Sequence, residues 1–243
     1  MNDYVELHQK LAELVTRSAR TVAPLVFDWL RPRSVLDVGC GNGTWLAAFW
    51  KAGVAEIVGV DGDYIDRAAL EIPADTFQTR DLQQPFDLGR RFDLVVSLEV
   101  AEHLPTAVST PFVESLTTHG DAVLFSAAIP GQGGVAHINE QWQSFWVERF
   151  QARGFKAVDI FRSRLWTNSD VAYWYAQNMI LFIRESALAN YTALPVPSEM
   201  PWDVVHPTRL TAVVRALPNT DAISIKQGFR AVVRGLRRRL IPG

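Results

Sequence analysis

The sequence lacks the cysteines that a disulfide framework or a thiolate metal cage would need. Cys40 is the single cysteine among 243 residues, so the chain cannot close an internal disulfide or bind zinc through several thiolates. Such cysteine usage is typical of proteins in a reducing compartment. We therefore expect a cytoplasmic protein.

Long apolar runs and a strong excess of one charge are also lacking. No stretch reaches the roughly 18 consecutive apolar residues of a membrane-spanning helix. The first residues, MNDYVELHQKLAELVTR, carry acidic side chains and no apolar core, so we do not expect a signal peptide. The formal net charge is −2, which supplies no positive field for nucleic acid. These absences favour a small molecule as the partner.

What the sequence does hold is an alternation of short apolar runs with segments of helical periodicity. We expect strands within 34–43, 56–61, 76–82, 92–98, 121–128, 155–162 and 177–183, and helices within 44–53, 64–70, 106–120 and 139–155. Strands that alternate with helices are typical of an α/β fold, in which helices cover both faces of a largely parallel sheet.

The two ends of the chain differ from this core, which we place at residues 31–185. Residues 1–30 predict a helical N-terminal cap of two helices interrupted near Pro24. Residues 186–243 predict an irregular C-terminal extension, since YTALPVPSEMPWDVVHP holds four prolines. The later stretch ISIKQGFRAVVRGLRRRL pairs apolar with basic positions. It predicts an amphipathic helix that either makes a peripheral membrane contact or is a solvated tail.

A glycine-rich turn follows the first expected strand. Gly39, Gly41 and Gly43 lie between the strand and the next helix, and Asp37 sits just before this turn. Such a turn lets backbone N–H groups face a ligand, and glycines let the ligand approach closely. Asp61 closes the following strand, where a carboxylate can accept both hydroxyl groups of a ribose. The spacing G-x-G-x-G differs from the G-x-G-x-x-G of dinucleotide-binding proteins.

Four motifs in order resemble those of the class I S-adenosylmethionine-dependent methyltransferases: LDVGCGNG, VGVD, RDL and FDLVVSLEVAEHL. The resemblance covers roughly residues 31–185. It implies a Rossmann-like, doubly wound sheet of seven strands whose last strand is antiparallel. It also implies S-adenosylmethionine as the cofactor. Carried over residue by residue, the methionine part would contact Asp37, Gly39, Gly41 and Gly43, the ribose Asp61, and the adenine Asp81 and Leu82, with Glu99 as a further cofactor contact.

Three polar residues follow the 92–98 strand and need a separate explanation. Glu99, Glu102 and His103 would share one face if a helix began there. His137, in the loop after the next strand, could meet them across the crevice at the carboxyl ends of the strands. Two glutamates and two histidines suit Mg²⁺, Mn²⁺, Fe²⁺ or Zn²⁺. The pattern is similar to that of metal-dependent small-RNA 2′-O-methyltransferases and, without the second histidine, of ubiquinone-pathway O-methyltransferases.

Two other interpretations of the cluster stay open. In one, His103 or His137 accepts a proton without a metal and Glu102 orients the base. In the other, the residues are structural and Glu99 only contacts the cofactor. Under both the metal interpretation and the metal-free interpretation, the expected reaction is methyl transfer from S-adenosylmethionine to a hydroxyl of a small molecule, such as a sugar or glycan precursor or a secondary metabolite.

Two alternative functions remain at the level of the sequence. One is a metal-dependent RNA 2′-O-methyltransferase, which the near-neutral charge disfavours. The other is a non-catalytic cofactor-binding or membrane-associated scaffold, which only the basic C-terminal stretch supports.

Overall fold

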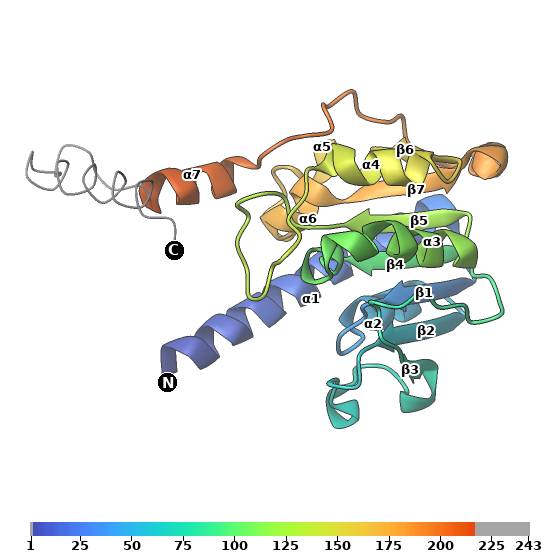
Figure 1. Cartoon of the computed structure of the whole chain (residues 1–243), viewed down its shortest axis with the longest axis horizontal. Coiled ribbons are helices and arrows are strands. Elements are labelled where there is room, and N and C mark those ends of the chain that lie inside the picture. Colours follow the sequence, from blue (N-terminus) through green and yellow to red (C-terminus); the bar gives the residue numbers. More distant parts are fainter. Residues whose placement is uncertain (1, 217–243) are drawn as a thin grey trace, which may run out of the picture. The chain divides into compact units, whose positions relative to one another are not determined.

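A computed structural model describes residues 2–216 of the chain, and its centre is one sheet of seven strands. The strands are β1 (Ser34–Val38), β2 (Glu56–Asp61), β3 (Phe77–Thr79), β4 (Leu94–Leu98), β5 (Ala122–Ser126), β6 (Phe155–Val158) and β7 (Ile180–Arg184). They lie in the order β3-β2-β1-β4-β5-β7-β6 (Figure 1). β7 runs antiparallel to β5 and β6, and the remaining neighbours pair in parallel. The predicted seven-stranded sheet with an antiparallel last strand is confirmed.

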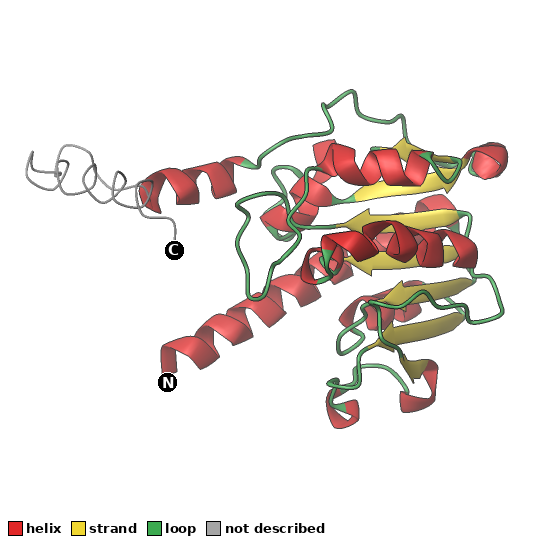
Figure 2. Ribbon diagram, viewed as in Figure 1, coloured by secondary structure: helices red, strands yellow, loops and turns green. Residues whose placement is uncertain are grey.

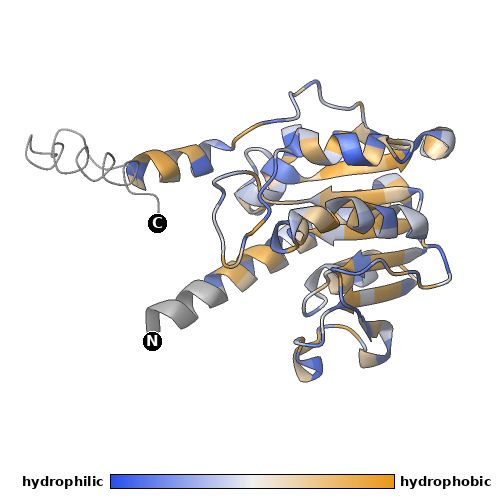
Figure 3. Ribbon diagram, in the orientation of Figure 1, coloured by the Kyte–Doolittle hydropathy of each residue, from blue (hydrophilic) through white to orange (hydrophobic). Residues whose placement is uncertain are grey.

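Helices cover both faces of this sheet (Figure 2). They are α1 (Asn2–Leu30), α2 (Thr44–Ala52), α3 (Ser109–His119), α4 (Gln143–Gln151), α5 (Arg162–Leu165) and α6 (Tyr173–Asn178). Successive strand residues point to opposite faces. Val95 of β4 therefore belongs to the apolar cluster that includes residues of α3 and α4, and Val96 to the cluster that includes residues of α1 and α2. The strands between these layers are largely apolar (Figure 3).

The N-terminal cap differs from its prediction because α1 is one continuous helix with Pro24 inside it. A proline within a helix loses one backbone hydrogen bond and usually kinks or breaks the helix. Here Ala19, Val22, Ala23 and Val26 are fully buried in the same apolar cluster as residues of α2. Burial of this face offsets the missing hydrogen bond.

Two predicted helices are shorter than expected. Within 64–70 only Arg67–Ala69 forms a single 3₁₀ turn, whose N-terminus is capped by the Asp66 carboxylate. The helix predicted within 139–155 begins at Gln143, because the preceding backbone is used elsewhere: the Asn139 N–H donates to the Glu102 carbonyl at 3.0 Å. That hydrogen bond joins the loop after β5 to the turn after β4.

The proline-rich segment 196–206, which we call the strap, packs on the core. Arg162 is fully buried, pairs with the Asp159 carboxylate at 2.8 Å, and donates to the carbonyls of Trp202 and Pro201. The Ser198 N–H donates to the Asp159 carbonyl. The chain through His206 accordingly belongs to the same compact unit as the sheet.

A second unit begins at Pro207, and its described part is the helix α7 (Pro207–Ala216). The predicted basic helix within 223–240 lies outside the described residues, so its membrane contact stays a prediction. In the described part of the chain, no helix combines the length and apolar character that membrane crossing requires.

Candidate active site

The glycine turn after β1 adopts a backbone that side chains disfavour. Gly39 and Gly43 have φ of +83° and +82°, a region that glycine enters without steric cost. A Cβ on Gly39 would lie 2.4 Å from a methyl carbon of Val100, and one on Gly43 would lie 2.8 Å from the Ile72 side chain. The turn therefore leaves no room for side chains at these two positions.

Asp61, at the end of β2, is held next to this turn. Its carboxylate accepts from the Gly41 N–H and the Gly62 N–H, both at 2.7 Å. The Tyr64 hydroxyl donates to the same carboxylate at 2.5 Å. These donors fix Asp61 at the carboxyl end of β2, where a ligand hydroxyl can reach it.

Asp37 lies behind the turn and is 3% exposed. Burial, and secondly the charge of Asp61, raise the pKa of its carboxyl to about 8. Asp37 does not line the pocket that opens beside the turn. Its expected contact with the methionine part of a cofactor stays a prediction.

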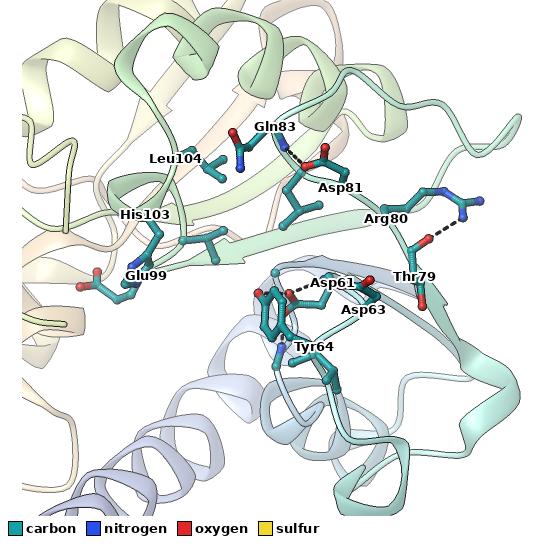
Figure 4. A pocket seen from close by; sticks show the side chains of 16 residues that line it. Asp61, Asp63, Tyr64, Thr79, Arg80, Asp81, Gln83, Glu99, His103 and Leu104 are labelled. Atoms are coloured by element: carbon teal, nitrogen blue, oxygen red, sulfur yellow. Dashed lines mark hydrogen bonds between the residues drawn. The ribbon is translucent and has the colours of Figure 1, made fainter. Parts of the chain in front are cut away.

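A pocket of about 840 Å³ opens beside the turn (Figure 4). Asp61 and Tyr64 lie on one side of it, and Glu99 and His103 on another. Six predicted cofactor residues line it: Gly39, Gly41, Asp61, Asp81, Leu82 and Glu99. The volume is within the usual range of small-molecule sites.

The helix considered after β4 does not begin at Glu99. The Glu99 backbone is left-handed, with φ of +56°, and a 3₁₀ turn begins only at Ala101. The Glu99 carboxylate accepts from the Gln132 amide at 2.7 Å and the Asn178 amide at 3.2 Å. Burial raises the pKa of its carboxyl, and these hydrogen bonds oppose the effect.

Glu102, His103 and His137 come together as predicted. Each offers one ligand atom, and these atoms lie within 4.8 Å of one another. Glu99 is not in this group, because amide donors hold its carboxylate. The structure therefore brings together three of the four predicted metal ligands.

Glu102 is fully buried, and neither of its carboxylate oxygens has a hydrogen-bond partner among the described residues. Burial, followed by the charge of Glu99, raises the pKa of this carboxyl well above its ordinary value. A buried polar group without a partner is costly. A buried carboxyl without a protein partner is often found where a metal ion, a water molecule or a ligand binds.

The two histidines of the cluster are placed by different neighbours. His103 lines the pocket, and burial, followed by the nearby His137, lowers its pKa. The His137 ring lies 4.8 Å from the His103 ring, and its Nδ1 lies 3.0 Å from the Glu140 carboxylate. Glu140 also accepts from the Gly131 and Gly133 N–H groups, so the same carboxylate stabilises the loop conformation and orients His137.

The comparisons with known proteins agree with this geometry. Residues 6–120 match a family model described as a methyltransferase domain, and solved methyltransferases share the fold. The chain has the fold of the class I S-adenosylmethionine-dependent methyltransferases. No curated protein sequence matches the chain significantly.

Three solved structures similar to the chain have under 25% identity and show the fold alone. The sugar N-methyltransferase KedS8 of a Streptoalloteichus species is 18% identical, with a TM-score of 0.57 over 74% of this chain and 92% of that one. S-adenosylmethionine-bound CalS10, an amino pentose methyltransferase of Micromonospora echinaspora, is 17% identical, with a TM-score of 0.54 over 76% and 97%. Magnesium protoporphyrin IX methyltransferase of Synechocystis with bound S-adenosylhomocysteine is 20% identical, with a TM-score of 0.51 over 68% and 83%.

The sequence did not single out several residues that complete the candidate site. Tyr64 follows Asp61 by three positions, a local signal that was available. Glu140 follows His137 by the same interval. Gln132 and Asn178 carried no local signal, because they reach Glu99 from separate segments of the chain.

Proposed function

We propose that this methyltransferase transfers the methyl group of S-adenosylmethionine to a hydroxyl of a small-molecule acceptor. The observation that carries the proposal is the convergence of Glu102, His103 and His137 next to a pocket lined by the cofactor motifs. The acceptor oxygen would lie between this three-residue cluster and the cofactor, and it attacks the methyl carbon in line with the S–CH₃ bond. That bond breaks, the electron pair stays on sulfur, and S-adenosylhomocysteine leaves.

The main contribution of the chain to this reaction is positional. Holding the oxygen and the sulfonium in line removes much of the entropic cost of their encounter, on the order of 7 kcal/mol in favourable systems. Asp61 would hold the ribose, while Gly39 and Gly41 would allow the methionine part to approach the backbone.

The donor set of the cluster fits a divalent metal ion. The Glu102 carboxylate lacks a protein partner among the described residues, and His103 and His137 supply nitrogen atoms within 4.8 Å. Mixed oxygen and nitrogen donors suit Mn²⁺, Fe²⁺ or Zn²⁺ better than Mg²⁺. When bound, such an ion would lower the pKa of the acceptor hydroxyl.

In the metal-free form of the proposal, His103 accepts the proton of the acceptor hydroxyl. The lowered pKa of His103 keeps the imidazole neutral near pH 7, so a ring nitrogen can accept the proton of the acceptor hydroxyl as the O–CH₃ bond forms. In this form Glu140 and His137 orient the neighbouring ring.

Metal analysis followed by turnover assays separates the two forms. Stoichiometric Mn²⁺, Fe²⁺ or Zn²⁺ in the purified protein, with activity lost in a chelator and restored by the ion, supports the metal form. Full turnover in the chelator supports His103 as the base. Loss of S-adenosylhomocysteine binding in either experiment would mean that the treatment damages the cofactor pocket rather than the cluster.

The acceptor class that we propose is a sugar, a glycan precursor or a secondary metabolite. A panel of glycans, amino sugars and phenols tests it, with nuclear magnetic resonance distinguishing O–CH₃ from N–CH₃ products. Exclusive N-methylation of amino sugars would overturn the hydroxyl assignment and retain the methyltransferase activity.

RNA 2′-O-methylation is the second candidate, and the metal-like cluster is the observation that favours it. A net charge of −2 disfavours it, because phosphate contacts dominate RNA affinity. Methylation of a single-stranded RNA in preference to every small molecule in the panel would establish it. A scaffold without catalysis would bind S-adenosylmethionine and methylate neither class.

A further inference from the structure

Glu99 is fixed by side chains from segments far apart in the sequence. The Gln132 amide donates to its Oε2 from the loop after β5, and the Asn178 amide donates to its Oε1 from the end of α6. Gln132 and Asn178 are buried. A buried polar network is stable when each member is paired, and it then favours one arrangement of its side chains.

The orientation of these amides is set at both ends of the network. At the outer end the backbone N–H of His206, in the strap, donates to the Gln177 Oε1 at 2.7 Å. The Gln177 amide nitrogen consequently faces the Gln132 Oε1 at 3.1 Å and the Asn178 Oδ1 at 2.9 Å.

At the inner end the donors of Gln132 and Asn178 face Glu99. Because both amides use their oxygens to accept from Gln177, their nitrogens are the groups turned toward the carboxylate. Both oxygens of Glu99 therefore act as acceptors, which is the role of an ionised carboxylate. The strap helps to orient these amides, because the His206 N–H donates to the Gln177 Oε1.

The backbone of Glu99 points to a ligand as the reason for this arrangement. A φ of +56° is uncommon for a residue other than glycine and persists where the surroundings enforce it, often at a functional site. Glu99 lines the same pocket as Gly39 and Gly41. A preorganised carboxylate in a largely buried position suits a cation.

We propose that Gln132 and Asn178 are positioning residues that hold the Glu99 carboxylate for the ammonium group of the cofactor's methionine part. The inference rests on the proposed function, since it requires S-adenosylmethionine in this pocket. Gln177 and the strap orient the two amides, so the segment after the core contributes to cofactor binding without contacting the cofactor.

Calorimetry with two ligands tests the proposal. S-adenosylhomocysteine carries the ammonium group, and methylthioadenosine keeps the adenosine and lacks the amino acid. Glu99→Gln and Asn178→Leu are expected to weaken S-adenosylhomocysteine binding by about tenfold or more, as for loss of a hydrogen bond to a charged group. Methylthioadenosine affinity is expected to stay within about twofold.

A double variant and a matched control make the assignment specific. Glu99→Gln combined with Asn178→Leu is expected to bind S-adenosylhomocysteine no more weakly than Glu99→Gln alone, because Asn178 acts through Glu99. Thr117→Val removes a buried hydrogen bond on α3. It is expected to lower the melting temperature and leave both affinities unchanged.

Three outcomes overturn the inference. The first is an equal loss of affinity for both ligands in Asn178→Leu. The second is unchanged S-adenosylhomocysteine affinity in Glu99→Gln, and the third is a loss of affinity in the double variant that equals the sum of the two single losses. Gln132→Leu replaces Asn178→Leu in the same test if the latter does not fold. If the unaltered protein binds neither ligand, the proposed function fails rather than the role of the amides.

Discussion

Asp37 couples the stability of the ligand-free protein to pH. Its pKa rises from 3.8 to about 8 on burial, so the folded state favours the protonated form. The stability that this proton provides is present below about pH 4 and is lost as the pH rises through about 8. Asp37→Asn cannot ionise. Its unfolding free energy is expected to fall less between pH 5 and 8.5 than that of the unaltered protein, by on the order of 1 kcal/mol or more.

Urea denaturation at the two pH values measures this difference. Parallel losses of stability in both proteins would contradict the assigned pKa of Asp37.

Glu102 is expected to act in turnover rather than in cofactor binding. Glu102→Gln keeps the shape and removes the ionisable carboxyl, so the turnover number is expected to fall by about 10² or more while S-adenosylhomocysteine affinity is unchanged. Steady-state kinetics and calorimetry measure the two effects. Glu114 lies on α3, is half-exposed and pairs with Arg153. Glu114→Gln is the control and should change neither. Equal turnover in both variants would remove Glu102 from the site.

At the residue scale, the sequence predicted those site residues that stand in a local motif. Asp61, next to the glycine turn, is one of them. Glu99 would have shared a helix face with Glu102 if a helix had begun there, and the structure shows it in a left-handed turn. The sequence could not predict this, because Gln132 and Asn178 reach Glu99 from distant segments.

At the scale of the element, the turn after β1 distinguishes two glycines with the same sign of φ. A Cβ on Gly39 would overlap the Val100 side chain, whereas one on Gly41 would meet no atom within 4 Å. Gly39→Ala is expected to destabilise the protein by about 2 kcal/mol or more and to weaken S-adenosylhomocysteine binding. Gly41→Ala should cost about 1 kcal/mol, from its φ of +54° alone.

Thermal unfolding and calorimetry of the two alanine variants check this order. Equal destabilisation would mean that the overlap with Val100 is relieved by movement of the turn after β4. A larger effect in Gly41→Ala would contradict the geometry of the turn.

Helix boundaries show where local pattern was insufficient. Pro24 predicted an interruption, and burial of the apolar face of α1 overrides it. The helix predicted within 139–155 begins only at Gln143 because Asn139 bonds to the Glu102 carbonyl. Both differences arise from contacts made by residues distant in the sequence.

At the scale of the whole molecule, cofactor binding should stabilise the compact unit that ends at His206. S-adenosylhomocysteine at about 100 times its Kd is expected to add about 2.7 kcal/mol to the unfolding free energy. For a unit of this size the melting temperature should rise by roughly 5 to 10 °C. Differential scanning fluorimetry measures the shift, with adenine alone as the control. An unchanged melting temperature at millimolar ligand would contradict cofactor binding.

The sequence by itself determined the class of fold, the glycine turn and the acidic residue after β2, because these depend on residues that are neighbours along the chain or along one strand. The tertiary structure alone decided which polar residues meet. It placed ligand atoms of Glu102, His103 and His137 within 4.8 Å of one another, and it paired the Glu99 carboxylate with the amides of Gln132 and Asn178. The physical reason is that a buried carboxylate is stabilised by whichever donors the packed elements bring within reach, and no periodicity in the sequence encodes that distance.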